Sequence, residues 1–175
     1  AVAVLLSRPG FELLGLWLSP AALTALAAAL FYLWALAWWA RAGLGEIDRF
    51  VLPATRADAV LAWSAATAGL AAEALRRVPA RALGWTVVVA LWAAVPLSGW
   101  QDAAHAQPFA GLGWAAWAAY ALFGVLGLRR LADDESAAAA HIGWLAAWTL
   151  SLSLAAHELA RAAGLGDGWI VAASA

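Results

Sequence analysis

The chain has 175 residues, of which 66% are hydrophobic and only 12% are charged. Soluble domains carry about 45–50% apolar and about 25% charged residues, so this composition excludes an ordinary soluble domain and indicates apolar surface facing lipid. The formal net charge of −1 excludes a basic field for nucleic acid, and the absence of cysteine excludes disulfides, cysteine zinc sites and thiol nucleophiles.

Five apolar segments have the length needed to cross a membrane, which takes about 20 residues for a hydrocarbon core of roughly 30 Å. The expected spans are residues 16–40, 57–78, 82–99, 109–130 and 137–163, with partial spans at the start and at residues 168–175. The sequence therefore predicts an all-α, polytopic transmembrane helix bundle. Residues 1–175 are expected to form a single transmembrane region within a longer chain.

Polar segments separate these spans and supply their expected helix ends. Residues 41–56 hold glycine, proline and five charged residues, and residues 100–108 form a polar stretch without arginine, so both are expected to be aqueous loops. Asp58 is a cap candidate for the second span, and the acidic turn at residues 133–135 is interpreted as a cap for the fifth.

Tryptophan is abundant, with 13 residues, and the pair Gly-Trp occurs five times, mostly near expected span ends. This placement is typical of the aromatic belts that anchor spans at the lipid headgroups. Trp92 and Trp148 lie nearer mid-span, where they would fill gaps between helices or stack on a ligand.

An internal repeat relates the two halves of the chain. Trp63, Glu73 and Arg76 recur as Trp148, Glu158 and Arg161 at identical spacing. This Trp-Glu-Arg set recurs after 85 residues. Tyr32 and Tyr120, each nine residues before an arginine, are 88 residues apart, and the Gly-Trp pairs that begin at residues 84 and 168 are 84 residues apart. One unit is then about three helices long, and an odd number of spans requires the second copy to cross in the opposite sense. Such inverted repeats occur in secondary transporters, although duplication also occurs in proteins that transport nothing.

Charged residues inside spans are costly and are functional candidates by default. The candidates here are the intramembrane charged pairs formed by Glu73, Arg76, Arg77, Glu158 and Arg161. They are interpreted either as ion pairs at the membrane surface, with arginine reaching toward water, or as charges that line a polar cavity.

Asp102 and His105 are polar candidates in the expected external loop at residues 100–108. No spacing of His and acidic residues is typical of a metal site, and no phosphate-binding loop or catalytic motif is present, so no catalytic residue, metal or cofactor is assigned. Arginine is distributed six to four between the two expected sides of the membrane, which favours an orientation with residues 100–108 away from the cytoplasm.

Two runs, GWAAWAAYALFGVLGLRRL at residues 113–131 and HIGWLAAWTLSLSLAAHELARAAGLGDGW at 141–169, are similar to the repeated core of a known family. The chain resembles the large, many-span bacterial "predicted membrane proteins" of unknown function, well over residues 105–170 and more loosely in the first half. The resemblance implies a multi-pass protein of the bacterial inner membrane with further spans of the same chain as its partners, and it transfers no catalytic residue.

The leading functional prediction is an integral inner-membrane protein without an assigned reaction, serving the cell envelope and surrounded by the lipid bilayer. Two alternatives stay open: a secondary transporter built on inverted repeats, for an unknown small molecule, and a membrane enzyme acting on lipid-linked sugars. The enzyme alternative would depend on Asp102, His105 and Arg49, a set too small to favour it, so the chain is expected not to be an enzyme.

Overall fold

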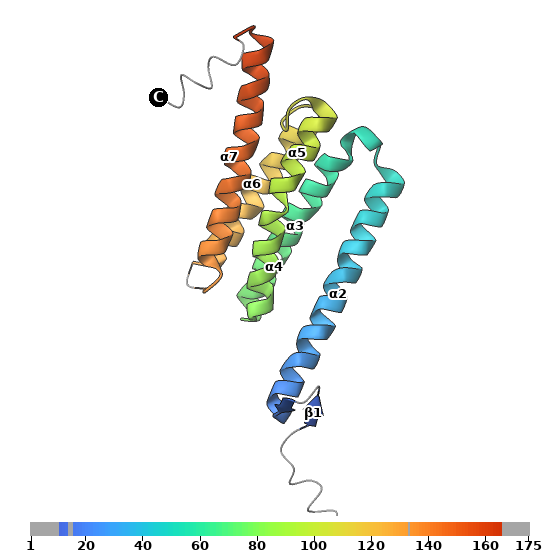
Figure 1. Ribbon diagram of the computed structural model, residues 1–175, viewed down its shortest axis with the longest axis vertical. Coiled ribbons are helices and arrows are strands. Elements are labelled where there is room, and N and C mark those ends of the chain that lie inside the picture. The colour runs from blue at the N-terminus through green and yellow to red at the C-terminus, as the bar shows by residue number, and fades with distance from the viewer. Residues whose placement is uncertain (1–10, 14–15, 133, 166–175) are drawn as a thin grey trace, which may run out of the picture. The chain divides into compact units, whose positions relative to one another are not determined.

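The computed structural model describes residues 11–13, 16–132 and 134–165. The chain separates into two compact units, residues 1–42 and residues 43–175, which are described separately. Apart from one short hairpin, every regular element in the described residues is helical (Figure 1). The expectation of an all-helical chain is confirmed at this level.

The first unit contains a small antiparallel hairpin and most of a long helix. Strands β1 (Phe11–Leu13) and β2 (Leu16–Leu18) pair with Phe11 opposite Leu18, and α2 (Pro20–Phe50) follows. The helix begins at Pro20 because proline is tolerated in the first turn, and the Ser19 hydroxyl accepts a 3.2 Å hydrogen bond from the Ala22 N–H.

Helix α2 departs from the expected span at 16–40 at both ends. Residues 16–18 are strand, and the helix continues past residue 41 to Phe50, so the expected loop at 41–56 was wrong over most of its length. The two glycines of this segment do not interrupt the helix, which stops only before Pro53 and the short 3-10 turn η1 (Pro53–Thr55).

The second unit is a bundle of helices α3 (Arg56–Arg77), α4 (Arg81–Trp92), α5 (Ala94–His105), α6 (Gly113–Arg130) and α7 (Ala137–Ala162). Helices α4 and α5 follow each other with a single break at Ala93. The break is explained by Pro96, which lacks an N–H and whose ring would collide with the carbonyl of Trp92. Because α5 continues to His105, the expectation of a loop at residues 100–108 was wrong over its first six residues.

Two sets of helices pack side by side in a parallel direction: α3 with α6, and α4 and α5 with α7. Gly69 on α3 lies against Phe123 on α6, and Asp58 at the start of α3 lies near Gly113 at the start of α6. In the same way Trp92 of α4 packs on Gly143 of α7, and the hydroxyls of Ser98 and Ser151 are 2.8 Å apart. Helices α3 and α6 therefore run in one direction, and α4, α5 and α7 run in the other.

The core lies between these helices and is built from small and aliphatic residues with two aromatic rings. Its fully buried members include Leu61, Ala65, Ala68, Leu91, Trp117 and Tyr120. Alanine and glycine at the contacts allow the helix backbones to approach closely, which is how membrane helices pack when lipid offers no hydrophobic drive toward association.

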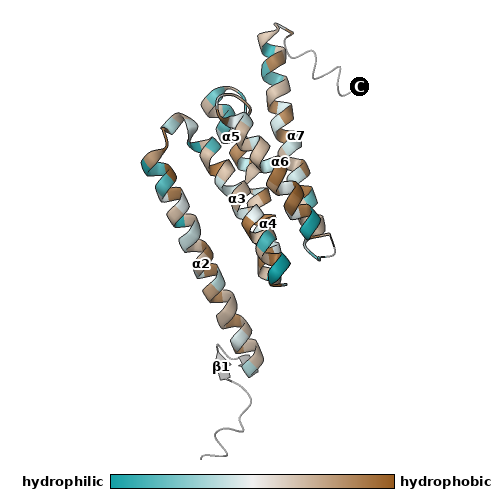
Figure 2. Cartoon of the chain, turned by 180° about the vertical axis from the view of Figure 1, so that it is seen from behind, coloured by the Kyte–Doolittle hydropathy of each residue, from teal (hydrophilic) through white to brown (hydrophobic). Residues whose placement is uncertain are grey.

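Three helical segments in the described residues are long and apolar enough to cross a membrane: Pro20–Phe50, Arg81–His105 and Ala137–Ala162. Helices α3 and α6, which correspond to the expected spans at 57–78 and 109–130, are not among them, so a count of five spans stays a prediction. Figure 2 shows hydrophobic residues along the helices and hydrophilic residues gathered toward their ends. The partial span expected at 168–175 lies outside the described residues.

Candidate functional site

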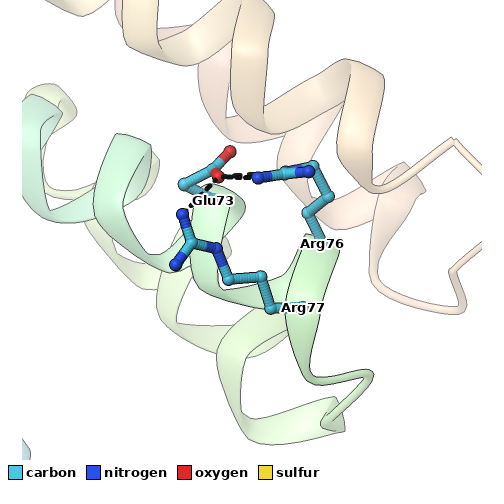
Figure 3. A network of polar contacts seen from close by, with 3 residues as sticks. All are labelled: Glu73, Arg76 and Arg77. Atoms are coloured by element: carbon cyan, nitrogen blue, oxygen red, sulfur yellow. Dashed lines mark hydrogen bonds and ion pairs between the residues drawn. The ribbon is translucent and has the colours of Figure 1, made fainter.

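The first expected charged group lies at the end of α3, where Glu73 binds two arginines (Figure 3). The Glu73 Oε1 atom accepts from Arg76 Nε at 2.9 Å and from an Arg77 guanidinium nitrogen at 3.4 Å. The side chains are between 41% and 71% exposed. Ion pairs this exposed contribute little to stability in water.

The second expected pair repeats this arrangement on α7. Arg161 donates from its Nε to Glu158 Oε2 at 3.0 Å and from a terminal nitrogen at 2.7 Å. The structure does not bring the two groups together, because α3 and α7 run in opposite directions and each group lies near the C-terminal end of its own helix. The two carboxylates therefore do not form one site.

Asp102 and His105 also differ from expectation, since both belong to helix α5 rather than to a loop. His105 does not pair with Asp102. Its Nε2 atom lies 3.2 Å from Oδ2 of Asp58, and the His105 side chain is only 13% exposed. The expected loop was therefore wrong for both residues, because α5 continues about six residues beyond the expected end at 99 and brings the His105 side chain to Asp58.

A buried polar cluster, Asp58, Gln101, His105 and Trp117, is the most distinctive arrangement of polar side chains in the bundle. Gln101 Nε2 donates to Asp58 Oδ1 at 2.7 Å, and Trp117 Nε1 donates to Gln101 Oε1 at 3.0 Å. Asp58 is 3% exposed, Gln101 0% and Trp117 1%. The cluster joins α3, α5 and α6 through hydrogen bonds that are shielded from solvent, where such bonds are strong and an unpaired group is costly.

Asp58 occupies this position because of where it falls on α3. It is the third residue of the helix, and no side chain caps the helix at Thr55, so the expected capping role of Asp58 was wrong. Its carboxylate points into the bundle and accepts from side chains of α5 instead. Glycine is needed at position 113 by the turn before α6, because a Cβ there would collide with the Pro108 carbonyl, while its distance of 3.4 Å from Asp58 Oδ1 would be an ordinary contact.

An aromatic cluster adjoins the polar one through the shared residue Trp117. The ring centroid of Trp117 lies 4.9 Å from that of Trp148, 5.1 Å from that of Tyr120 and 5.6 Å from that of Phe109. Tyr120 also donates its hydroxyl to the carbonyl of Leu91 at 2.9 Å. Trp148 therefore fills a gap between helices, which is one of the two roles expected for it. Trp92 does the same against Gly143, and its indole donates to the Ala139 carbonyl at 2.9 Å.

The acidic turn at residues 133–135 was expected to cap α7, but no side-chain hydrogen bond caps the helix at Ser136, and residue 133 lies outside the described residues. Asp134 Oδ1 accepts from the Ser136 N–H at 2.8 Å and from the Ser136 hydroxyl. These hydrogen bonds, with a smaller effect of the nearby Arg81 charge, hold the pKa of Asp134 below its ordinary value. The turn is tied to the start of α4 by an ion pair between Arg81 and Glu135 at 3.3 Å.

Sequence reasoning missed Gln101 and assigned the wrong role to Asp58. The spacing of Gln101 four residues before His105 places both side chains on one helix face, so it could have indicated that they contact the same neighbouring helix. In the part of the chain that the structure describes, no group of three or more His, Asp or Glu side chains is placed to hold a metal ion.

Comparison with known proteins gives no relative. No family model matches the chain, and neither a curated protein nor a solved structure matches it.

Proposed function

We propose that the chain is part of an integral, multi-span protein of the bacterial inner membrane that serves the cell envelope, with no reaction assigned to it. The observation that carries this proposal is the exposed surface of α2. Its most apolar stretch has no buried residue, and Phe31 is 71%, Trp34 63% and Trp38 59% exposed. Exposed apolar area of this extent is stable in lipid and would cause aggregation in water.

A bacterial inner membrane, with further spans of the same chain as partners, is what the sequence resemblance to the large many-span bacterial membrane proteins implies, and it is part of this proposal. The exposed Leu and Trp residues of α2 offer a surface for those spans or for lipid acyl chains. The Gly-Trp pairs support the same placement, since Trp85, Trp100 and Trp114 are all exposed.

Membrane integration is tested by expressing the 175-residue chain in a bacterium and extracting the membranes with alkaline carbonate. An integral protein stays in the pellet after carbonate and is released by detergent. Recovery in the carbonate supernatant would contradict the proposal, because peripheral proteins are released by this treatment.

A second candidate function, a secondary transporter, is favoured by one observation, the buried Asp58–His105 pair. Acidic and histidine side chains inside membrane bundles mark proton and ion pathways in transporters. If the pair serves transport, Asp58→Asn abolishes uptake of a solute while leaving the folded fraction unchanged in detergent. Uptake that survives Asp58→Asn and is lost in Glu73→Gln or Glu158→Gln would place the pathway at the ion pairs instead.

Within residues 16–132 and 134–165, no arrangement of side chains favours the enzyme alternative. Asp102 and His105 lie on α5, where His105 is held by Asp58, and Arg49 lies over the ring of Phe50 at 5.2 Å.

A further inference from the structure

Helix α6 presents a single exposed stripe to its surroundings. Trp114, Ala118, Leu122, Val125 and Arg129 are exposed and follow each other at intervals of three or four residues, which places them on one face of the helix. The opposite face is buried in the bundle: Gly113, Ala116, Trp117, Tyr120, Gly124 and Gly127. The exposed stripe is therefore apolar over most of its length and ends in an arginine.

The exposed stripe of α6 is long enough to cover most of the thickness of a bilayer core. From Trp114 to Arg129 the helix rises by about 22 Å, somewhat less than the roughly 30 Å of a full hydrocarbon core. Arginine keeps its aliphatic stem along apolar surface while its guanidinium reaches the headgroups. If α6 crosses the membrane as the sequence predicts, Trp114 and Arg129 mark the two ends of its lipid-facing surface and the guanidinium lies at headgroup depth.

The arginines at this end of the bundle fall into two classes. Arg76 and Arg77 bind Glu73, and Arg81 binds Glu135. Arg129 and Arg130 are exposed, and among the residues that the structure describes neither has a carboxylate partner. These two guanidinium groups therefore carry positive charge that the described part of the protein does not neutralise.

We propose that Arg129 and Arg130 bind the phosphate of an anionic phospholipid, whose acyl chain lies along the Trp114–Val125 stripe of α6. The guanidinium fork matches phosphate oxygens in geometry and forms charge-assisted hydrogen bonds with them. An anionic lipid fits better than a zwitterionic one because no positive headgroup charge opposes the two arginines. This inference rests on the proposed membrane location, and it adds the class of ligand and the residues that recognise it.

The test uses the full chain reconstituted in phosphatidylcholine bilayers with spin-labelled phosphatidylglycerol or phosphatidylcholine as the probe. Electron paramagnetic resonance separates lipid at the protein surface from bulk lipid and gives a relative association constant for each headgroup. We expect the preference for phosphatidylglycerol to fall about fivefold for each arginine replaced in Arg129→Gln and Arg130→Gln, which corresponds to about 1 kcal/mol per arginine.

The matched control is Arg161→Gln, which removes an arginine bound by Glu158 at the opposite end of the bundle and is expected to leave the preference unchanged. Arg129→Lys with Arg130→Lys keeps both charges without the planar fork, so it should retain part of the preference. This variant also serves if the glutamine variants do not fold.

Three outcomes would overturn the proposal. The first is an unchanged preference in the double glutamine variant, and the second is an equal loss of phosphatidylcholine binding, which would show general lipid contact without headgroup recognition. The third is displacement of the lipid by inorganic phosphate at constant ionic strength, which would identify free phosphate as the ligand. If the protein resists carbonate extraction but shows no headgroup preference, the lipid-binding proposal alone fails and the proposed membrane location stands.

Discussion

Asp58 shows how a single carboxylate can organise three helices. It is buried in a unit rich in apolar residues, and its partners in the described residues are an amide and an imidazole, with no arginine among them. A buried carboxylate is tolerated only when donors saturate its oxygens. Gln101 is therefore a structural partner whose loss also leaves the indole N–H of Trp117 without an acceptor.

Replacing Gln101 by leucine should destabilise the bundle by about 3 kcal/mol, because it leaves the buried Oδ1 atom of Asp58 and the buried N–H of Trp117 without a hydrogen-bond partner. Thermal unfolding of the purified protein in detergent measures the effect. Asp102→Asn is the matched control on the same helix, since no hydrogen bond of its carboxylate is observed, and its midpoint should stay close to that of the wild type. Equal midpoints for Gln101→Leu and Asp102→Asn would refute a structural role for the buried polar cluster.

The acid sensitivity of the turn before α7 follows from Asp134. Its pKa in the folded protein lies below the ordinary value of about 3.9, so its contribution to stability is complete above that value and is lost as the pH falls through the folded pKa. In Asp134→Asn the thermal midpoint should fall less between neutral pH and about pH 3 than it does in the wild type. Ser136→Ala should weaken the acid dependence in part, since the backbone donor remains, and a fall identical to that of the wild type in Asp134→Asn would contradict this account.

At the residue scale, the sequence identified polar residues better than it identified their partners. The spacing of Glu73 with Arg76 and of Glu158 with Arg161 predicted local ion pairs, and both form because residues three apart on a helix are neighbours. The contact between His105 and Asp58 joins residues 47 apart in the sequence. Local spacing carries no information about such a contact, which depends on how α3 and α5 pack.

At the scale of elements, glycine determines how closely neighbouring helices approach. A Cβ at Gly143 would lie 2.5 Å from a carbon of the Trp92 ring, whereas a Cβ at Gly99 would have no atom within 4 Å. Gly143→Ala should therefore destabilise the bundle by about 1–3 kcal/mol through overpacking. Gly99→Ala should be neutral or stabilising by up to about 1 kcal/mol, because alanine favours a helix.

Both glycine variants are measured by thermal unfolding in the same detergent. A Gly143→Ala midpoint equal to that of Gly99→Ala would show that the packing of α4 against α7 is looser than the contact between Trp92 and Gly143 indicates.

Helix ends were predictable where proline sets them. Pro79 follows the extended residue Val78 and ends α3 close to the expected boundary at 78. Charge and glycine were weaker signals, since α2 runs through the charged residues Glu46, Asp48 and Arg49 before it ends. The length of an element in this chain depends on the loss of backbone hydrogen bonds at proline more than on the polarity of its residues.

The three-helix inverted repeat is a prediction about topology. The Glu73 and Glu158 pairs lie on helices that run in opposite directions, as an inverted relation requires, while the last repeat element at 168–175 lies outside the described residues. Reporter fusions after residues 45, 80, 104, 133 and 166 should alternate between the two sides of the membrane. Finding the fusions after 80 and 166 on one side would eliminate the inverted repeat.

At the scale of the whole molecule, arginine is unevenly distributed between the two ends of the helical bundle at residues 43–165. One end carries Arg76, Arg77, Arg81, Arg129 and Arg130; the other carries Arg49, Arg56 and Arg161. Cytoplasmic loops carry the excess of arginine in membrane proteins. We therefore expect the turns at 78–80 and 131–136 in the cytoplasm and the end of α5 on the opposite side.

The most direct test of membrane crossing uses single cysteines, because the natural chain has none. Val78→Cys, Ala104→Cys and Ala132→Cys replace exposed residues at the two ends of the bundle, and a membrane-impermeant maleimide reports their side in spheroplasts. Our account predicts labelling of Ala104→Cys in intact spheroplasts and of the other two only after permeabilisation. Labelling of Val78→Cys and Ala104→Cys from the same side would contradict it, because α4 and α5 would then not cross the membrane.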